Sequence, residues 1–145
     1  MESVELGVDM MIVWFDVDVV ELDVRASNGS YTATTRCYAG RRHFFVEAAA
    51  LLRGFPASAG DRRELAFGAL DPATTLGGVK MVFTCPRPTG WPSVEVVMKS
   101  GPEQDRAFAQ FSFPVESAAI DDFVRSLQAV ETRIGAQLRL RHAPD

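Results

Sequence analysis

The sequence predicts one α+β domain over residues 1–145: a twisted antiparallel sheet of about six strands with two helices packed on one face. Three observations carry this prediction. Asn28-Gly29 separates two alternating runs, later alternating runs are joined by short turn-rich connections, and two longer segments repeat apolar residues at helical spacing. Short connections favour antiparallel neighbours. A chain of 145 residues is long enough to bury a core unaided.

The early hairpin is the strongest local signal. Asn28-Gly29 suits a type I′ turn, because both residue types tolerate positive φ. A turn centred on this pair places Glu21 opposite Arg36 on a polar face and leaves the opposite face mostly apolar. The hairpin therefore has one face that suits water and one that suits a core.

Residues 4–26 have the alternation of extended chain, with two changes of parity between Trp14 and Val20. A period-2 pattern that slips by one residue implies a bulge, a bend or a turn between two strands. The pattern alone leaves these three alternatives open. Residues 7–9 are the best candidate for the break, because Gly7 interrupts the run there.

A first helix is expected over residues 43–54, after Ala39-Gly40 closes the hairpin. Its apolar residues recur at i, i+3, i+4 and i+7, and Gly54 is placed to end it. Four strand candidates follow at 64–70, 79–85, 94–99 and 106–113, with Gly- and Pro-containing connections between them.

A second helix is expected to begin with Ser117 as its N-cap and to carry an apolar stripe as far as Ile134. Gly135 is placed to stop it. Leu138 and Leu140 then alternate with arginines, so the tail is either a short strand or a frayed basic end.

Acidic residues are concentrated at the start of the chain. Residues 1–24 hold seven of the 19 acids and none of the 15 bases, in a chain of net charge −4. One interpretation is a solvated strand face, and the other is an acidic patch that binds a basic protein through Asp16, Asp18, Glu21 and Asp23. A chain of this charge lacks the basic stripe of a nucleic-acid-binding protein.

No motif in the sequence points to an enzyme, a metal or a cofactor. Zinc-ligand spacing, the phosphate loop, the dinucleotide fingerprint and the nucleophile elbow are all missing. Two weaker constellations remain. Cys37 and His43 can be imagined as nucleophile and base, and Asp16 and Asp18, two residues apart on a strand, as a cation site or paired carboxylates.

The two cysteines, Cys37 and Cys85, fall on apolar phases of expected strands, so buried free thiols are predicted. The chain begins without a secretory signal pattern, and its longest early apolar run, 10–15, is too short to span a bilayer. A cytoplasmic protein without membrane contact is expected. Trp91, in a Pro-rich turn, either folds back on the sheet or stands out as a contact residue.

The order hairpin, helix, four strands and helix resembles that of the WapI-type immunity proteins and neighbouring small bacterial families of unknown function. The matching features are residues 20–24 before Asn28-Gly29, then Cys37, Leu51-Leu52, Phe55-Pro56, Phe111-Ser112-Phe113, Phe123 and Leu127. Glu21-Leu22 stands where that family has a Trp-Leu pair. The resemblance implies a non-enzymatic protein that binds and blocks a toxin domain.

Three functions follow as hypotheses. The first is a protein-binding module, of the immunity type, that uses an acidic N-terminal sheet face. The second is a small-molecule-binding protein or enzyme with a pocket between sheet and helices, suggested by an ample supply of phenylalanines. The third is a homodimer formed through an unprotected sheet edge.

Overall fold

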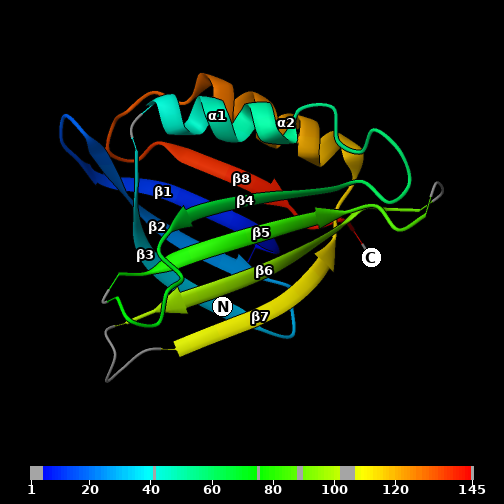
Figure 1. Cartoon of the computed structure of the whole chain (residues 1–145), viewed down its shortest axis with the longest axis horizontal. Coiled ribbons are helices and arrows are strands. Elements are labelled where there is room, and N and C mark those ends of the chain that lie inside the picture. Colours follow the sequence, from blue (N-terminus) through cyan, green and yellow to red (C-terminus); the bar gives the residue numbers. More distant parts are fainter. Residues whose placement is uncertain (1–4, 41, 75, 88–89, 102–106, 145) are drawn as a thin grey trace.

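The computed structural model of the chain describes residues 5–40, 42–74, 76–87, 90–101 and 107–144. The chain forms two helices and two antiparallel sheets of four strands each (Figure 1). The α+β class predicted from the sequence is confirmed. The single sheet of about six strands is wrong, because residues 7–15 and 137–141 are further strands and the eight strands divide between two sheets.

The first sheet has the strand order β3-β2-β1-β8 and the second has the order β4-β5-β6-β7. The elements are β1 (Gly7–Phe15), β2 (Val19–Ser27), β3 (Thr32–Gly40), α1 (Arg42–Leu52), β4 (Arg62–Gly68), β5 (Gly78–Thr84), β6 (Ser93–Ser100), β7 (Ala107–Pro114), α2 (Ser117–Ala129) and β8 (Gln137–Arg141). Each strand predicted from alternation between 64 and 113 is present with its ends moved by a few residues; Arg106, at the start of the last one, lies outside the described residues.

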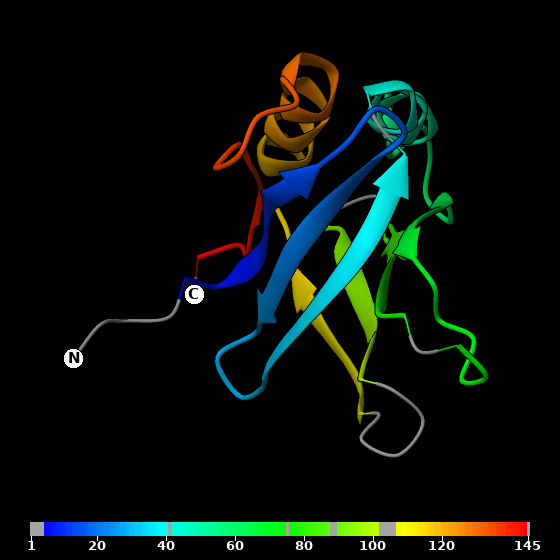
Figure 2. The same ribbon diagram turned by 90° about the vertical axis from the view of Figure 1, so that its left-hand side faces the viewer.

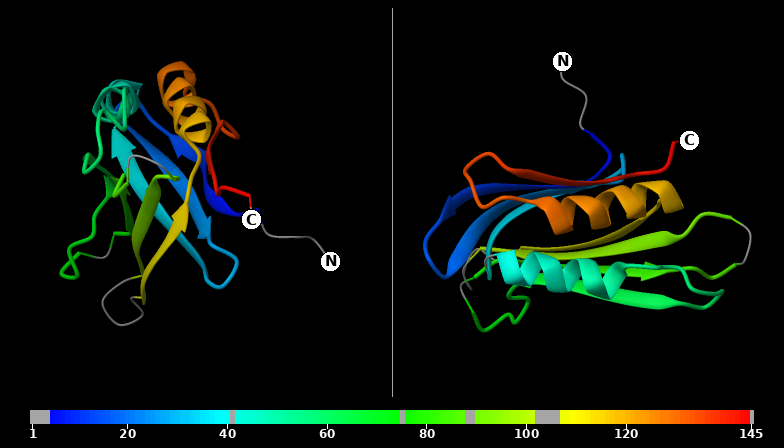
Figure 3. Two further views of the ribbon diagram at one scale, coloured as in Figure 1. Left: turned by 90° about the vertical axis from the view of Figure 1, so that its right-hand side faces the viewer. Right: turned by 90° about the horizontal axis from the view of Figure 1, so that it is seen from above.

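The two sheets face each other, and both helices lie side by side along one open side of the pair (Figures 2 and 3). Helix α1 packs against β3 and β4, helix α2 packs against β8, and the helices pack against each other. They therefore close the gap between the sheets, and do not lie on one face of a single sheet as predicted. The largest buried side chains come from both sheets and both helices, among them Phe45, Phe67, Phe83, Phe113, Phe123 and Met81.

The β2–β3 connection differs from the predicted two-residue turn. Ser27 pairs with Thr32, so four residues make the connection. The side-chain oxygen of Asn28 accepts hydrogen bonds from the backbone N–H groups of Ser30 (3.0 Å) and Tyr31 (2.9 Å). This use of the asparagine favours a longer loop over a type I′ turn, and Asn28 does not adopt positive φ.

Every cross-strand partner is consequently displaced by two positions from the prediction. Leu22 pairs with Cys37, and Glu21 pairs with Tyr38. A displacement of two leaves each side chain on its predicted face, because side chains alternate with period 2. Arg36 still forms an ion pair with Glu21, at 3.5 Å and diagonally across the ladder.

The break in the N-terminal extended segment lies at residues 16–18, between β1 and β2, and not at 7–9. Gly7 instead begins β1. A register shift between Ile12 and Trp14 marks a β-bulge, which accounts for the first change of parity in the sequence. The second change is the turn itself.

Both predicted helices are present. The first ends close to the predicted glycine, and the second ends earlier than predicted. Helix α1 stops at Leu52, and Gly54 follows with φ of +80°, as its placement predicted. Helix α2 has Glu116 as its N-cap in place of Ser117 and already ends at Ala129. Ile134 lies beyond this helix and is 65% exposed, so the predicted apolar stripe ends earlier.

Arg63 at the start of β4 fastens the end of helix α1 to the second sheet. Its guanidinium donates to the carbonyl oxygens of Leu51 (3.1 Å) and Arg53 (3.2 Å), which a helix end leaves without partners. It also donates twice to the Asp61 carboxylate, at 3.1 and 2.9 Å. The hydrogen bonds from Arg63, and one from the backbone of Ala57, hold the pKa of Asp61 below its usual value.

Asp61 should therefore make the fold more sensitive to acid. A carboxyl whose pKa is lowered by folding stabilises the protein fully above its unfolded pKa of about 3.9, and loses this contribution as the pH falls through the folded value. We expect Asp61→Asn to be less stable than wild type near neutrality and to lose less of its remaining stability on acidification. Urea unfolding at a series of pH values measures this. Asp121→Asn, at an exposed carboxylate on α2, is the control for the loss of one negative charge.

Candidate interaction surface and the adjoining hollow

The outer face of the first sheet carries mostly polar side chains, which alternate along each strand with the buried apolar side chains of the core. We define the outer face by the outward side chains of its four strands: Asp9, Met11 and Trp14 on β1; Glu21, Asp23 and Arg25 on β2; Thr34, Arg36 and Tyr38 on β3; Gln137, Arg139 and Arg141 on β8. Their neighbours in sequence, such as Leu22 and Leu138, point inward and are buried.

Two aromatic side chains stand on this face on either side of Glu21. Trp14 pairs with Glu21, and Glu21 pairs with Tyr38, so the three lie in one row across the sheet. Trp14 is 44% exposed and Tyr38 is 42% exposed. The β-bulge is what turns Trp14 outward, since without it Trp14 would share the inward parity of Ile12. A hydrogen bond to the Glu21 carboxylate, together with its charge, raises the pKa of the Tyr38 hydroxyl.

Arginines from distant parts of the chain lie among the N-terminal acids. Arg139 contacts Asp9 at 2.8 Å and Glu5 at 3.7 Å. Arg36 contacts Glu21 at 3.5 Å and Asp23 at 3.8 Å. Burial raises the pKa of Asp9, and the adjacent Arg139 acts in the opposite direction. The outer face is therefore of mixed charge, although the segment that supplies its central strands is acidic.

Of the acidic contact residues predicted from the sequence, two lie on the outer face and two lie in a turn. Glu21 and Asp23 lie on the outer face, as expected. Asp16 and Asp18 lie in the β1–β2 turn and not on a strand face, and the Asp16 carboxylate accepts from the backbone N–H groups of Asp18 (2.8 Å) and Val19 (2.9 Å). The prediction of paired carboxylates on a strand is therefore wrong. The Asp16 carboxylate instead stabilises the β1–β2 turn through these two hydrogen bonds.

Trp91 lies apart from this group. It stands in the connection between β5 and β6 of the second sheet. That connection and the β1–β2 turn lie at opposite ends of the molecule (Figures 1 and 3). Its side chain is 50% exposed, so it is not folded back as a buried residue. Trp91 and the outer face therefore belong to different surfaces.

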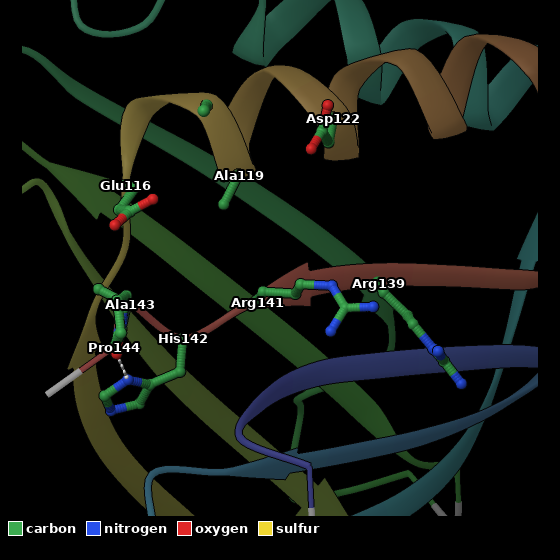
Figure 4. A pocket seen from close by; sticks show the side chains of 9 residues that line it. Glu116, Ala119, Asp122, Arg139, Arg141, His142, Ala143 and Pro144 are labelled. Atoms are coloured by element: carbon green, nitrogen blue, oxygen red, sulfur yellow. Dashed lines mark hydrogen bonds between the residues drawn. The ribbon is translucent and has the colours of Figure 1, made fainter.

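Two shallow hollows adjoin each other along β8. One, of about 310 Å³, lies on the outer face and is lined by Asp9, Met11, Asp23, Arg25, Gln137 and Arg139, with Glu5 and Met10. The other, of about 250 Å³, lies between α2 and β8 (Figure 4). Arg139 lines both of them.

The hollow beneath α2 is polar on both walls. Glu116 and Asp122 project from the helix side, and Arg139, Arg141 and His142 come from β8 and the segment after it (Figure 4). The His142 ring stacks on Phe113 with centroids 5.4 Å apart, and its Nδ1–H donates to the Ala143 carbonyl. Asp122 is paired with Arg125 on the same helix.

Cys37 and His43 do not form the nucleophile and base considered from the sequence. Cys37 points into the core from β3, and burial raises the pKa of its thiol to about 12. The His43 side chain is exposed on α1, where it contacts Glu47 at 2.9 Å. Both cysteines are buried and free, which confirms the prediction made for them.

Within the described ranges, no three His, Cys, Asp or Glu side chains are grouped closely enough to hold a metal ion. Likewise, none of the helices in the described part of the chain has the length and apolarity needed to cross a membrane.

Sequence reasoning missed Trp14 and Tyr38 as surface residues. The parity change near Trp14 was the available signal, but a bulge and a turn alter parity in the same way. Arg139 was visible as an alternating arginine, yet its position beside Asp9 depends on β8 pairing with β1 across almost the whole length of the chain.

Comparison with protein families, curated proteins and solved structures found no match for this chain. The fold and the surface themselves define an α+β protein of two facing antiparallel sheets, with a row of aromatic and charged side chains across the outside of one sheet.

Proposed function

We propose that the protein is a non-enzymatic protein-binding module and that the outer face of the first sheet is its contact surface. The observation that carries this proposal is the row in which half-exposed Trp14 and Tyr38 flank Glu21. Tryptophan, tyrosine and arginine are the residues that most often dominate the free energy of binding at protein interfaces. Methionine is also enriched there, and Met11 lies one row away.

The charge pattern suggests how a partner is recognised. Glu5, Asp9, Glu21 and Asp23 lie among Arg25, Arg36, Arg139 and Arg141, so this surface has no large excess of either sign. A partner selected only for being basic would meet as many arginines as carboxylates. We therefore propose a folded protein domain that offers an apolar recess for Trp14 and charges of both signs around it.

A toxin domain is the partner that the resemblance to immunity proteins implies. A rigid sheet face suits that role, because an inhibitor must hold its contact residues in place before binding. We propose inhibition by direct occlusion, with no catalytic step contributed by this chain.

Trp14→Ala is expected to weaken binding of the partner by about 30-fold, the loss typical of a truncated hot-spot tryptophan. The full-length protein serves as bait, any toxin domain found to be encoded by a neighbouring gene is the first candidate partner, and isothermal titration calorimetry gives each Kd. Trp91→Ala is the matched control, since it removes a similarly exposed tryptophan from a different surface. Equal binding by both variants, or the absence of any partner at low salt, would contradict the proposal.

The alternative of a small-molecule-binding protein or enzyme rests on the hollow beneath α2. Ligand pockets commonly measure about 300–1,000 Å³ and surround most of their ligand. The hollow is smaller, at about 250 Å³, and Asp122 on its wall is already paired with Arg125. The outer face is therefore the better-supported site.

A further inference from the structure

Strand β7 is an edge strand, and its hydrogen bonds show which of its backbone groups face the free edge. It pairs with β6 on one side. The Val115 N–H donates to the Pro92 carbonyl (3.0 Å), so the odd-numbered residues of β7 direct their backbone groups toward β6. Phe108, Gln110, Ser112 and Pro114 must then direct theirs toward the free edge.

The free edge of β7 is occupied at its C-terminal end. The Pro114 carbonyl accepts from the Ala143 N–H at 2.8 Å, and the Ser112 carbonyl accepts from the Asn28 side-chain amide at 3.1 Å. Among the described residues, no hydrogen bond satisfies the free-edge N–H and C=O groups of Phe108 and Gln110. With respect to the described residues, these two consecutive edge positions thus offer four unpaired backbone groups.

The other edge strands are protected in ways that β7 is not. Strand β4 carries the exposed charged side chains Arg62 and Glu64, and β8 carries Arg139 and Arg141 beside α2. Along β3, Gly77 packs closely against the Arg36 carbonyl. Charged side chains and covering segments are the usual means of preventing edge-to-edge association.

Within the part of the chain that the structure describes, residues 107–110 of β7 have no such protection. The whole strand, Ala107–Pro114, contains no charged residue. Phe108 is 54% exposed, and the neighbouring Ala107 and Ala109 are too small to obstruct an approaching backbone.

We propose that β7 pairs antiparallel with β7 of a second copy of this chain, about a two-fold axis at Ala109. Phe108 of each copy then exchanges both backbone hydrogen bonds with Gln110 of the other, which satisfies all four open groups. A two-fold interface brings identical residues together, and an uncharged strand opposes no like charges. The two second sheets become one continuous eight-stranded sheet, and the outer face of each first sheet stays free.

A disulfide tests the register directly. In the proposed ladder Ala109 faces its own copy as a non-hydrogen-bonded pair, with Cα atoms about 4.5 Å apart, which lies within disulfide range. Ala109→Cys is expected to form a covalent dimer under mild oxidation. Ala107→Cys, one step along the same face, would have Cα atoms about 14 Å apart and should stay largely monomeric on a non-reducing gel. The native thiols are buried and should not contribute.

A proline substitution tests whether the free edge of β7 forms the dimer, and it leaves the pairing of β7 with β6 intact. The Gln110 N–H faces the free edge, so Gln110→Pro removes only the intermolecular donor and is tolerated at such a position. We expect its dimer dissociation constant to rise about 30-fold or more, measured by sedimentation equilibrium. Ala66→Pro, at the equivalent outward position on β4, should leave the dimer intact.

A wild-type protein that remains monomeric at near-millimolar concentration overturns the proposal, and the open edge would then be available only to a strand from another protein. Equal cross-linking of Ala107→Cys and Ala109→Cys overturns the proposed register. Circular dichroism of each variant separates a lost interface from a lost fold.

Discussion

Lys99→Met is expected to lower the free energy of unfolding by about 3 kcal/mol, because it removes a buried ammonium group and leaves its partly buried carbonyl partners without this donor. Lys99 is fully buried on β6. Its Nζ donates to the carbonyl oxygens of Asp71 (2.9 Å), Thr74 (2.6 Å) and Leu76 (2.7 Å), and to the Thr74 hydroxyl (3.0 Å). One ammonium group therefore holds together the connection between β4 and β5.

Lys80→Met is the matched control for this substitution. Lys80 lies on the neighbouring strand and is partly exposed, and its Nζ lies 3.9 Å from a Glu64 carboxylate oxygen. Surface ion pairs of this kind contribute about 0–1 kcal/mol, so the control should be nearly as stable as wild type. Urea unfolding monitored by tryptophan fluorescence compares the two. A Lys99→Met protein as stable as Lys80→Met would show that the connection is held by other contacts.

Gly68→Ala is expected to cost about 3 to 4 kcal/mol, through a backbone term and a steric term. Gly68 has φ of +76°, which disfavours any residue with a Cβ. A Cβ at this position would also lie 2.4 Å from the Gly77 carbonyl oxygen and 2.5 Å from the Cys37 Cβ. Here β4 of the second sheet lies in close contact with Cys37 on β3 of the first, so this neighbour cannot withdraw without moving a strand.

Gly60→Ala separates these two terms. Gly60 has φ of +87°, but a Cβ there would meet nothing within 4 Å. It should therefore cost only the backbone term, about 1 kcal/mol. Thermal and urea unfolding of both variants give the difference. Equal destabilisation would mean that the two sheets can separate slightly at Gly68 without loss of stability.

Much of the local structure could be predicted from particular residues. The alternation of Val20, Leu22 and Val24 placed the correct side chains in the core even though the turn after them was misjudged. Gly54 marked the end of α1, and the cysteines were correctly placed on inward positions. Such features depend on neighbours within a few residues along the chain.

The interaction surface could be predicted only in part. Glu21 and Asp23 were identified, but the acidic patch became a mixed surface when Arg36 and Arg139 came to lie among its carboxylates. Lys99 looked like an ordinary outward lysine of an alternating strand. Its burial depends on a connection more than 20 residues earlier in the chain folding over it.

The sequence by itself determined both helices, six of the strands and, apart from the bulged end of β1, which side of each strand is apolar, because periodicity and turn chemistry act over a few residues. Only the tertiary structure decided that the strands divide into two sheets, that the acids acquire arginine partners, and that one uncharged edge is left open. These outcomes depend on which distant strands pair, and pairing is chosen by the packing of the whole core.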